Sequence, residues 1–137
     1  MKNYILLMAI ISITGCSTQP IPTNQASVVS ADRVWDKNIT KNKDNAGTLI
    51  VKRDSGFIGS ACFTSIYIDG NPIADLDTRE KVTIYPKIGR HVLSATPRGW
   101  CAGGTVEVEA NVELNKPLIY RIGYGANGDF RFSPTAF

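Results

Sequence analysis

The sequence predicts an all-β fold of about seven or eight short strands, arranged as an antiparallel sandwich or a small barrel. Short segments rich in β-branched and aromatic residues recur from residue 47 onward. Turn-forming residues separate these segments about every 8–12 residues, which is the spacing of an all-β domain. One segment alternates strictly between apolar and polar residues, and no segment shows a sustained helical period.

The first half of the domain contains five expected strands. Segment 48–54, TLIVKRD, is the first. Segment 62–76 predicts two strands joined by a tight turn at Asp69-Gly70-Asn71, because glycine accepts a positive φ without steric cost. Segments 81–87 and 90–97 predict two more strands, with a turn at Ile88-Gly89 between them.

Segment 105–114, TVEVEANVEL, is the clearest strand in the sequence. Its valines, alanine and leucine alternate with glutamates and asparagine, so one face is apolar and the other is acidic. This pattern is typical of a half-exposed antiparallel sheet. Segments 117–125 and 129–133 complete the predicted set.

The polar segment before the domain predicts a flexible tether. Residues 17–45 are rich in Ser, Thr, Asn, Gln, Lys and Pro, and they lack a sustained apolar period. We therefore expect a tether at 16–45 and the β domain at 46–137. Val34 and Trp35 are the apolar exceptions, and they would dock onto the domain if the segment folded back.

The N-terminus has the pattern of an export signal. Lys2 precedes about ten mostly apolar residues, which is too short for the roughly 20 residues of a membrane-spanning helix. The tetrad Ile13-Thr14-Gly15-Cys16 then resembles the lipobox of bacterial lipoproteins. That resemblance implies that residues 1–15 are removed as a signal peptide and that Cys16 carries the lipid anchor. Ser17 follows instead of Asp, which favours the outer membrane, with the domain facing the periplasm.

Cys62 and Cys101 remain once Cys16 is assigned to lipidation. An exported chain meets an oxidising compartment, so we expect these two cysteines to form a disulfide. A metal pair and a redox pair are the alternatives. The sequence has no CxxC motif, and His91 is its only histidine, which disfavours both.

Two stretches carry a family resemblance. The segments IYIDGNPIADL and VTIYPKIGRHVLSATP resemble PEGA-like domains at Asp69, Gly70, Pro86, Gly89 and His91, although the acidic residue of the PEGA turn is missing. Segment 106–125 resembles the closing part of an uncharacterised family of small bacterial lipoproteins. The resemblance implies an immunoglobulin-like sandwich with a binding or structural role in the envelope. It supplies no catalytic residue.

The loop PRGWCAGGT, at 97–105, is the first candidate for a binding surface. It holds Arg98 and Trp100 next to Cys101, and Arg and Trp are enriched in binding hot spots. A disulfide to Cys62 would bring the loop that carries Phe57 close to it. Tyr124, on a third glycine-rich loop, is the other candidate. The alternative is that Trp100 packs on the disulfide inside the core.

A competing hypothesis is an enzyme that acts on wall glycans, with His91 and either Glu107 or Asp75 as catalytic groups. A base of this kind needs a nucleophile and an orienting partner, but no G-x-S-x-G motif is present. The acidic residues near 75–80 and 107–113 lack the pattern of a calcium loop, so we interpret them as solvated faces. We expect neither a metal nor a cofactor.

The charge balance argues against a nucleic-acid partner. The formal net charge is +3, and the basic residues are scattered along the chain. We therefore expect a non-enzymatic envelope lipoprotein that binds another protein or peptidoglycan from its membrane anchor. An inhibitor or immunity lipoprotein directed against a lysozyme or a toxin is the main alternative.

Overall fold

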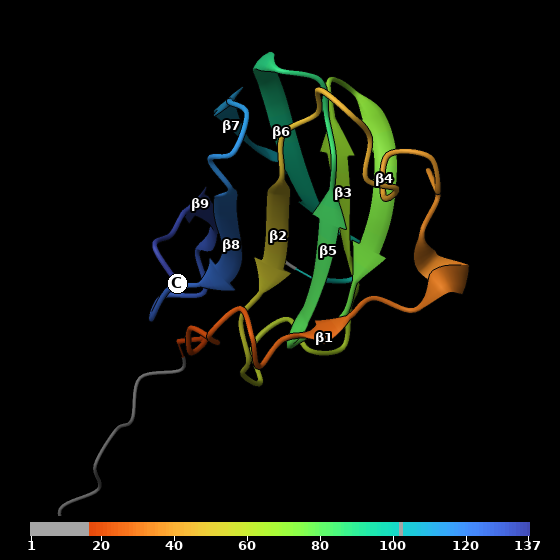
Figure 1. The fold of residues 1–137 in the computed structure, drawn as a ribbon. Coiled ribbons are helices and arrows are strands. Elements are labelled where there is room, and N and C mark those ends of the chain that lie inside the picture. The colour runs from red at the N-terminus through yellow and green to blue at the C-terminus, as the bar shows by residue number, and fades with distance from the viewer. Residues whose placement is uncertain (1–16, 102) are drawn as a thin grey trace, which may run out of the picture.

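The protein folds as a β-sandwich, as the sequence predicts (Figure 1). The structure is a computed structural model that describes residues 17–101 and 103–137. Within these residues it has nine strands and one short 3₁₀ helix. The elements are β1 (Ser27–Val28), η1 (Ala31–Arg33), β2 (Leu49–Arg53), β3 (Thr64–Ile68), β4 (Asn71–Leu76), β5 (Glu80–Ile84), β6 (Gly89–Pro97), β7 (Val106–Val112), β8 (Leu118–Tyr124) and β9 (Phe130–Pro134).

The strands form two sheets that face each other. One sheet has the order β1-β5-β2-β8-β9, and the other has the order β4-β3-β6-β7. The four-stranded sheet is antiparallel throughout. The five-stranded sheet is mixed, because β1 runs parallel to β5 and β2 runs parallel to β8. The expectation of a purely antiparallel sandwich is therefore wrong for this sheet. No tight turn joins either parallel pair, so nothing local imposes opposite directions.

The predicted turns and alternation explain the local structure. The turn between β3 and β4 places Asp69 at φ 49° and Gly70 at φ 77°, both in the left-handed region that the Asp-Gly pair accepts. In β7, Ala110 and Val112 are buried, whereas the glutamates on the other face are exposed. The period-two pattern therefore assigned the correct face of β7 to the core.

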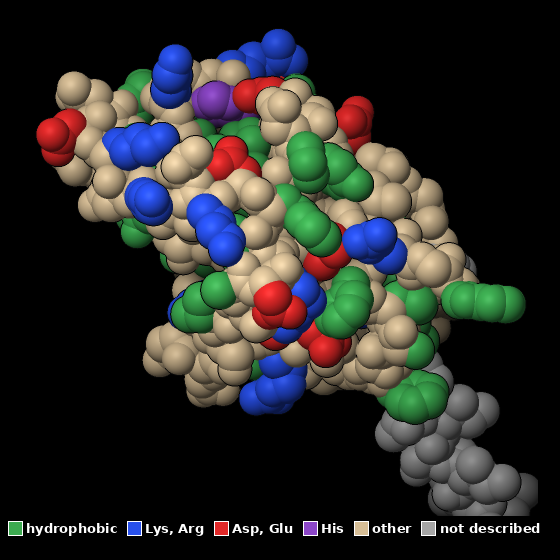
Figure 2. Space-filling model, turned by 90° about the vertical axis from the view of Figure 1, so that its right-hand side faces the viewer, with side chains coloured by type: hydrophobic (Ala, Val, Ile, Leu, Met, Phe, Trp, Pro, Cys, Tyr) green, Lys and Arg blue, Asp and Glu red, His purple; other side chains and the backbone are tan. Residues whose placement is uncertain are grey.

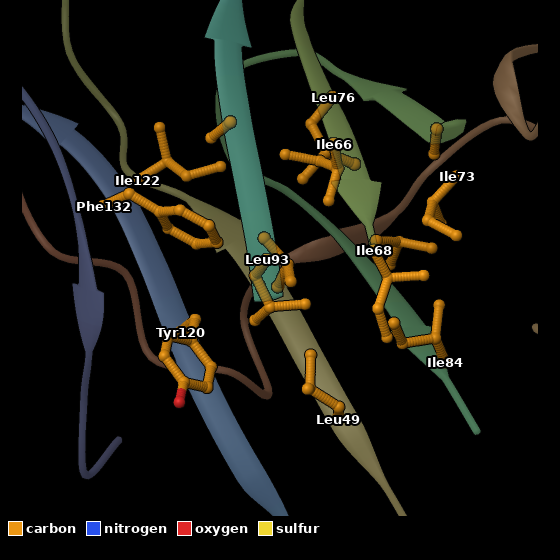
Figure 3. Packing of buried hydrophobic residues seen from close by; sticks show 14 of the residues in the cluster. Leu49, Ile66, Ile68, Ile73, Leu76, Ile84, Leu93, Tyr120, Ile122 and Phe132 are labelled. Carbon is orange, nitrogen blue, oxygen red and sulfur yellow. The ribbon is translucent and has the colours of Figure 1, made fainter. Parts of the chain in front are cut away.

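The core lies between the two sheets (Figure 3). Leu49 and Ile122 project into it from one sheet, and Ile66 and Leu93 project from the other; all four are fully buried. Aromatic rings close the side of the core near β8 and β9. The rings of Tyr120 and Phe132 meet edge to face, with their centroids 5.8 Å apart.

Residues 17–45 do not form the flexible tether that their composition predicts. Ser27 and Val28 pair with β5, and Val29 is part of the buried core. Val34 forms a β-bridge with Ala74 and packs against the core, so the alternative in which this segment docks is confirmed. A few well-spaced apolar residues suffice to hold a polar segment on the domain. The average composition of the segment does not reveal them, because polar residues outnumber them.

The docked N-terminal segment covers a buried lysine. The side chain of Lys52 lies on the outer face of the five-stranded sheet, where it is completely buried. Its Nζ donates to the carbonyl of Ile21 at 2.5 Å and to the backbone oxygen of Phe137. Burial lowers the pKa of Lys52, because the charged ammonium is removed from water. Residues from both ends of the described chain thus meet over β2.

Within residues 17–101 and 103–137, the structure contains no helix with the length and apolar character needed to cross a bilayer.

Candidate functional site

An open cleft lies at one end of the sandwich, where β3 and β5 end and β4 and β6 begin. We call it the upper cleft, and its volume is about 660 Å³, within the range of ligand sites. Aromatic and proline side chains are combined in its lining with residues of both charges. The lining residues are Trp35, Asp36, Asn38, Ile39, Lys43, Asp44, Asn45, Ala46, Ile68, Asp69, Asn71, Pro72, Tyr85, Pro86, Lys87 and His91.

Segment 35–46 forms one wall of the upper cleft, and backbone hydrogen bonds hold it in place. The N–H of Trp35 donates to the carbonyl of Ile73, and the N–H of Tyr85 donates to the carbonyl of Ile39, both at 2.8 Å. Trp35 is still 57% exposed, so its backbone is fixed while its ring remains accessible. A fixed backbone with an accessible aromatic ring is suited to binding, since little freedom is lost on association.

The opposite wall contains an Asp–His pair. His91 Nδ1 lies 2.6 Å from Asp69 Oδ2, and His91 Nε2 lies 2.8 Å from the carbonyl oxygen of Lys87. The hydrogen bond from the N–H of Val92, together with the contact to His91, holds the pKa of Asp69 below its ordinary value. Because oxygen acceptors within the protein engage both ring nitrogens, neither is placed to take a proton from a nucleophile.

The predicted catalytic residues do not converge. His91 pairs with Ala110 on the inner side of its sheet, whereas Glu107 lies on the outer face and accepts a hydrogen bond from Ser94. Asp75 is buried on that outer face as well, where it accepts from Ser65 and Arg98, both at 2.6 Å. A glycan-acting enzyme would need these groups in one pocket.

The loops proposed for binding lie at the other end of the sandwich, which we call the lower end. The Cys62–Cys101 disulfide is confirmed, and it joins the loop after β2 to the loop after β6. Arg98 also connects these loops, since its N–H donates to the carbonyl of Phe63 at 2.9 Å. The side chains of Phe57 and Trp100 are 91% and 102% exposed, so Trp100 does not pack on the disulfide inside the core.

Tyr124 has a structural role at the lower end. It is only 5% exposed, and a Cβ added at Gly59 would lie 2.4 Å from its ring. Gly59 is thus the residue that allows the loop after β2 to rest on the ring. Burial raises the pKa of the Tyr124 hydroxyl. Tyr124 supports the loop that carries Phe57 and offers little surface to a partner.

The described chain begins at the lower end, because Thr18 is fixed beside Tyr124. The N–H of Thr18 donates to the carbonyl of Tyr124 at 3.0 Å, and the N–H of Tyr124 donates to Thr18 Oγ1 at 2.7 Å. Gln19 and Ser55 also pair through their backbones. Cys16, the predicted lipidation site, and the predicted signal peptide lie outside the described residues.

Sequence reasoning placed the binding surface on the lower loops and missed the upper cleft. Asp69, Pro86 and His91, which carry the PEGA-like resemblance, are the only signal that pointed to it, because all three line the cleft. Among residues 17–101 and 103–137, no group of three or more His, Cys, Asp or Glu side chains is arranged to hold a metal ion. No family model, curated protein or solved structure matches the chain.

Proposed function

We propose that the protein is a lipid-anchored lipoprotein of the outer membrane that binds an envelope protein or peptidoglycan without catalysing a reaction. The observation that carries this proposal is the placement of two features at opposite ends of one rigid sandwich. Ser17, which follows the predicted lipidation site in the sequence, lies at the lower end, and the turns that line the upper cleft lie at the other end of the sandwich (Figure 1). A domain anchored in this way presents its cleft away from the membrane.

The cleft supports binding of an extended chain more than capture of a small enclosed molecule. It is open to solvent, and Trp35 and Tyr85 supply aromatic side chains to its lining. Lys43, Lys87 and Asp44 provide charges of both signs in the same lining. Open clefts of this kind suit a peptide or a polymer segment, which contributes its own backbone polar groups along the groove.

The PEGA-like resemblance supports the same proposal. Its matching residues lie in the turn between β3 and β4, in the turn between β5 and β6, and at the start of β6; Asp69, Pro86 and His91 among them line the cleft. In a sandwich, loops at one end are free to vary while the sheets hold them in place, and binding residues concentrate on such loops.

We expect Trp35→Ala to weaken retention of the envelope partner at least about tenfold, because exposed Trp side chains at the centre of an interface often dominate its affinity. The measurement has two arms. One is co-purification from crosslinked envelopes with quantitative mass spectrometry, and the other is co-sedimentation with isolated peptidoglycan sacculi.

Trp100→Ala is the matched control, because it removes the same side chain at the opposite end of the domain. It should retain the partner at the wild-type level. If Trp100→Ala loses the partner and Trp35→Ala retains it, the proposal is contradicted. The binding surface would then lie on the lower loops. If neither arm yields a partner, the binding proposal fails. The enzyme hypothesis is then tested by comparing wall-glycan turnover in the wild type and in the variant His91→Ala.

Cys16→Ser tests the anchor separately. We expect this variant to lose incorporation of labelled palmitate and to move from the membrane fraction to the soluble fraction, because the cysteine thiol is the predicted acceptor of the lipid. Ser17→Ala is the control, since it leaves that thiol in place. Palmitate incorporation that persists in Cys16→Ser would refute lipidation at this residue.

A further inference from the structure

We propose that the lower end of the sandwich rests on the lipid surface, with Phe57 and Trp100 inserted among the lipid headgroups. This inference rests on the lipid anchoring proposed above and assigns a role to two side chains that the fold does not explain. Both belong to loops that the disulfide joins, and both are almost fully exposed. Large aromatic side chains exposed on two loops that a disulfide joins indicate a surface that is covered in the working protein.

The attachment point leaves the domain little freedom to move away from the membrane. Thr18 is buried and bonded to Tyr124 and Asp54, so the rigid domain begins at this residue. Only Ser17 separates Thr18 from Cys16. The two Cα–Cα steps from Thr18 to Cys16 span at most about 7 Å, so a lipid on Cys16 would hold the lower end in contact with the headgroups.

Phe57 is next to this attachment point. Gly56, at φ 142°, passes so close to the chain that an added Cβ would lie 3.0 Å from the Cα of Thr18. Gln19 and Ser55 form a backbone bridge on the same side. Phe57 follows Gly56 directly, and its side chain points out from the domain with 91% exposure. Its neighbours therefore fix it beside the residues that lead to the anchor.

Trp100 is held at the same end by covalent and polar contacts. Cys101 is bonded to Cys62, and its Sγ lies 3.8 Å from the carbonyl of Gly59. In the loop that this disulfide joins to that of Trp100, the carbonyls of Cys62 and Gly59 accept hydrogen bonds from the guanidinium of Arg53. These contacts order the loop, although the Trp100 side chain itself contacts little of the protein.

The chemistry of this surface matches a lipid headgroup region. Trp is enriched at membrane–water interfaces because its ring is apolar and its N–H is polar. Two of the exposed arginines at this end are paired with acids, Arg98 with Asp75 and Arg131 with Asp129. Figure 2 shows hydrophobic side chains projecting from the lower end of the face that it presents, while the single histidine lies near the upper end.

The two tryptophans of the chain make the orientation measurable. Trp35→Phe leaves Trp100 as the only tryptophan, and Trp100→Phe leaves Trp35 at the upper cleft. Each full-length variant is expressed in a bacterial host, extracted from its membrane and reconstituted into vesicles of phosphatidylethanolamine and phosphatidylglycerol with brominated acyl chains. Tryptophan fluorescence is compared with that in unbrominated vesicles, and flotation shows whether the protein is attached.

We expect bromine to quench Trp100 about twofold and to leave Trp35 unchanged, because quenching requires near contact with the upper acyl chain. Attached protein without quenching of Trp100 overturns the inference and leaves the anchor intact. Equal quenching of both tryptophans overturns the upright orientation. Protein that does not float with the vesicles lacks the anchor, and then the proposed function and this inference both fail.

Discussion

A variant with serine at both Cys62 and Cys101 has a free energy of unfolding about 4 kcal/mol below that of the oxidised protein. The disulfide joins residues 39 positions apart, so it removes many conformations from the unfolded chain. It also fixes two loops that lack regular pairing with each other. We expect urea unfolding, followed by circular dichroism, to show a much lower midpoint for the variant.

The reducing agent dithiothreitol supplies the control for this prediction. Wild-type protein unfolded in dithiothreitol should match the double serine variant, because both lack the same covalent link. Equal midpoints for oxidised and reduced wild-type protein would contradict an energetic role for the disulfide. A loss of about 4 kcal/mol in the free energy of unfolding is a large fraction for a small domain, whose net stability is typically about 5–15 kcal/mol.

Replacing Arg53 by methionine lowers the free energy of unfolding by about 3 kcal/mol, because it leaves buried carbonyl groups without donors. Arg53 is 2% exposed and donates to the carbonyls of Cys62 at 2.6 Å and Leu76 at 2.9 Å, as well as to that of Gly59. Burial lowers the pKa of its guanidinium. The same urea experiment measures the loss, and the loop after β2 should become sensitive to proteases.

Arg90→Met is the matched control, since Arg90 is exposed and pairs only with Glu109 on the surface. It should change the stability by less than about 0.5 kcal/mol. An Arg53→Met variant as stable as the wild type would show that the cost of burying the charge cancels the benefit of its hydrogen bonds. In that case the order of the loop would depend on the disulfide and on its packing against Tyr124.

The strands were predictable because their pattern is local. Alternation in β7 and the Asp-Gly turn before β4 each specify a structure through neighbouring residues alone. The Cys62–Cys101 pairing followed from elimination once Cys16 was set aside. The partners of β2 were not predictable, since pairing with β8 joins residues almost 70 positions apart without a short connection.

The upper cleft was not predicted because one of its walls is formed by segment 35–46, whose apolar residues do not repeat with a regular period. Trp35 lies among polar residues, and it reaches the domain through a backbone bond to Ile73 that leaves no sequence pattern. Lys52 and Arg53 were missed for a related reason. Charged residues at the end of a strand are usually solvated, and only the chain segments that fold over them reveal that both are buried.

The parallel pairing of β2 with β8 has a consequence for the order of folding. As the chain emerges from N-terminus to C-terminus, β3, β4, β6 and β7 are all present once residue 112 has appeared, so the antiparallel sheet can assemble early. β2 must wait for residues 118–124 before its second edge is covered. The last residues then close over Lys52. Until then the nascent domain has an open sheet edge. Open edges promote aggregation and are bound by chaperones.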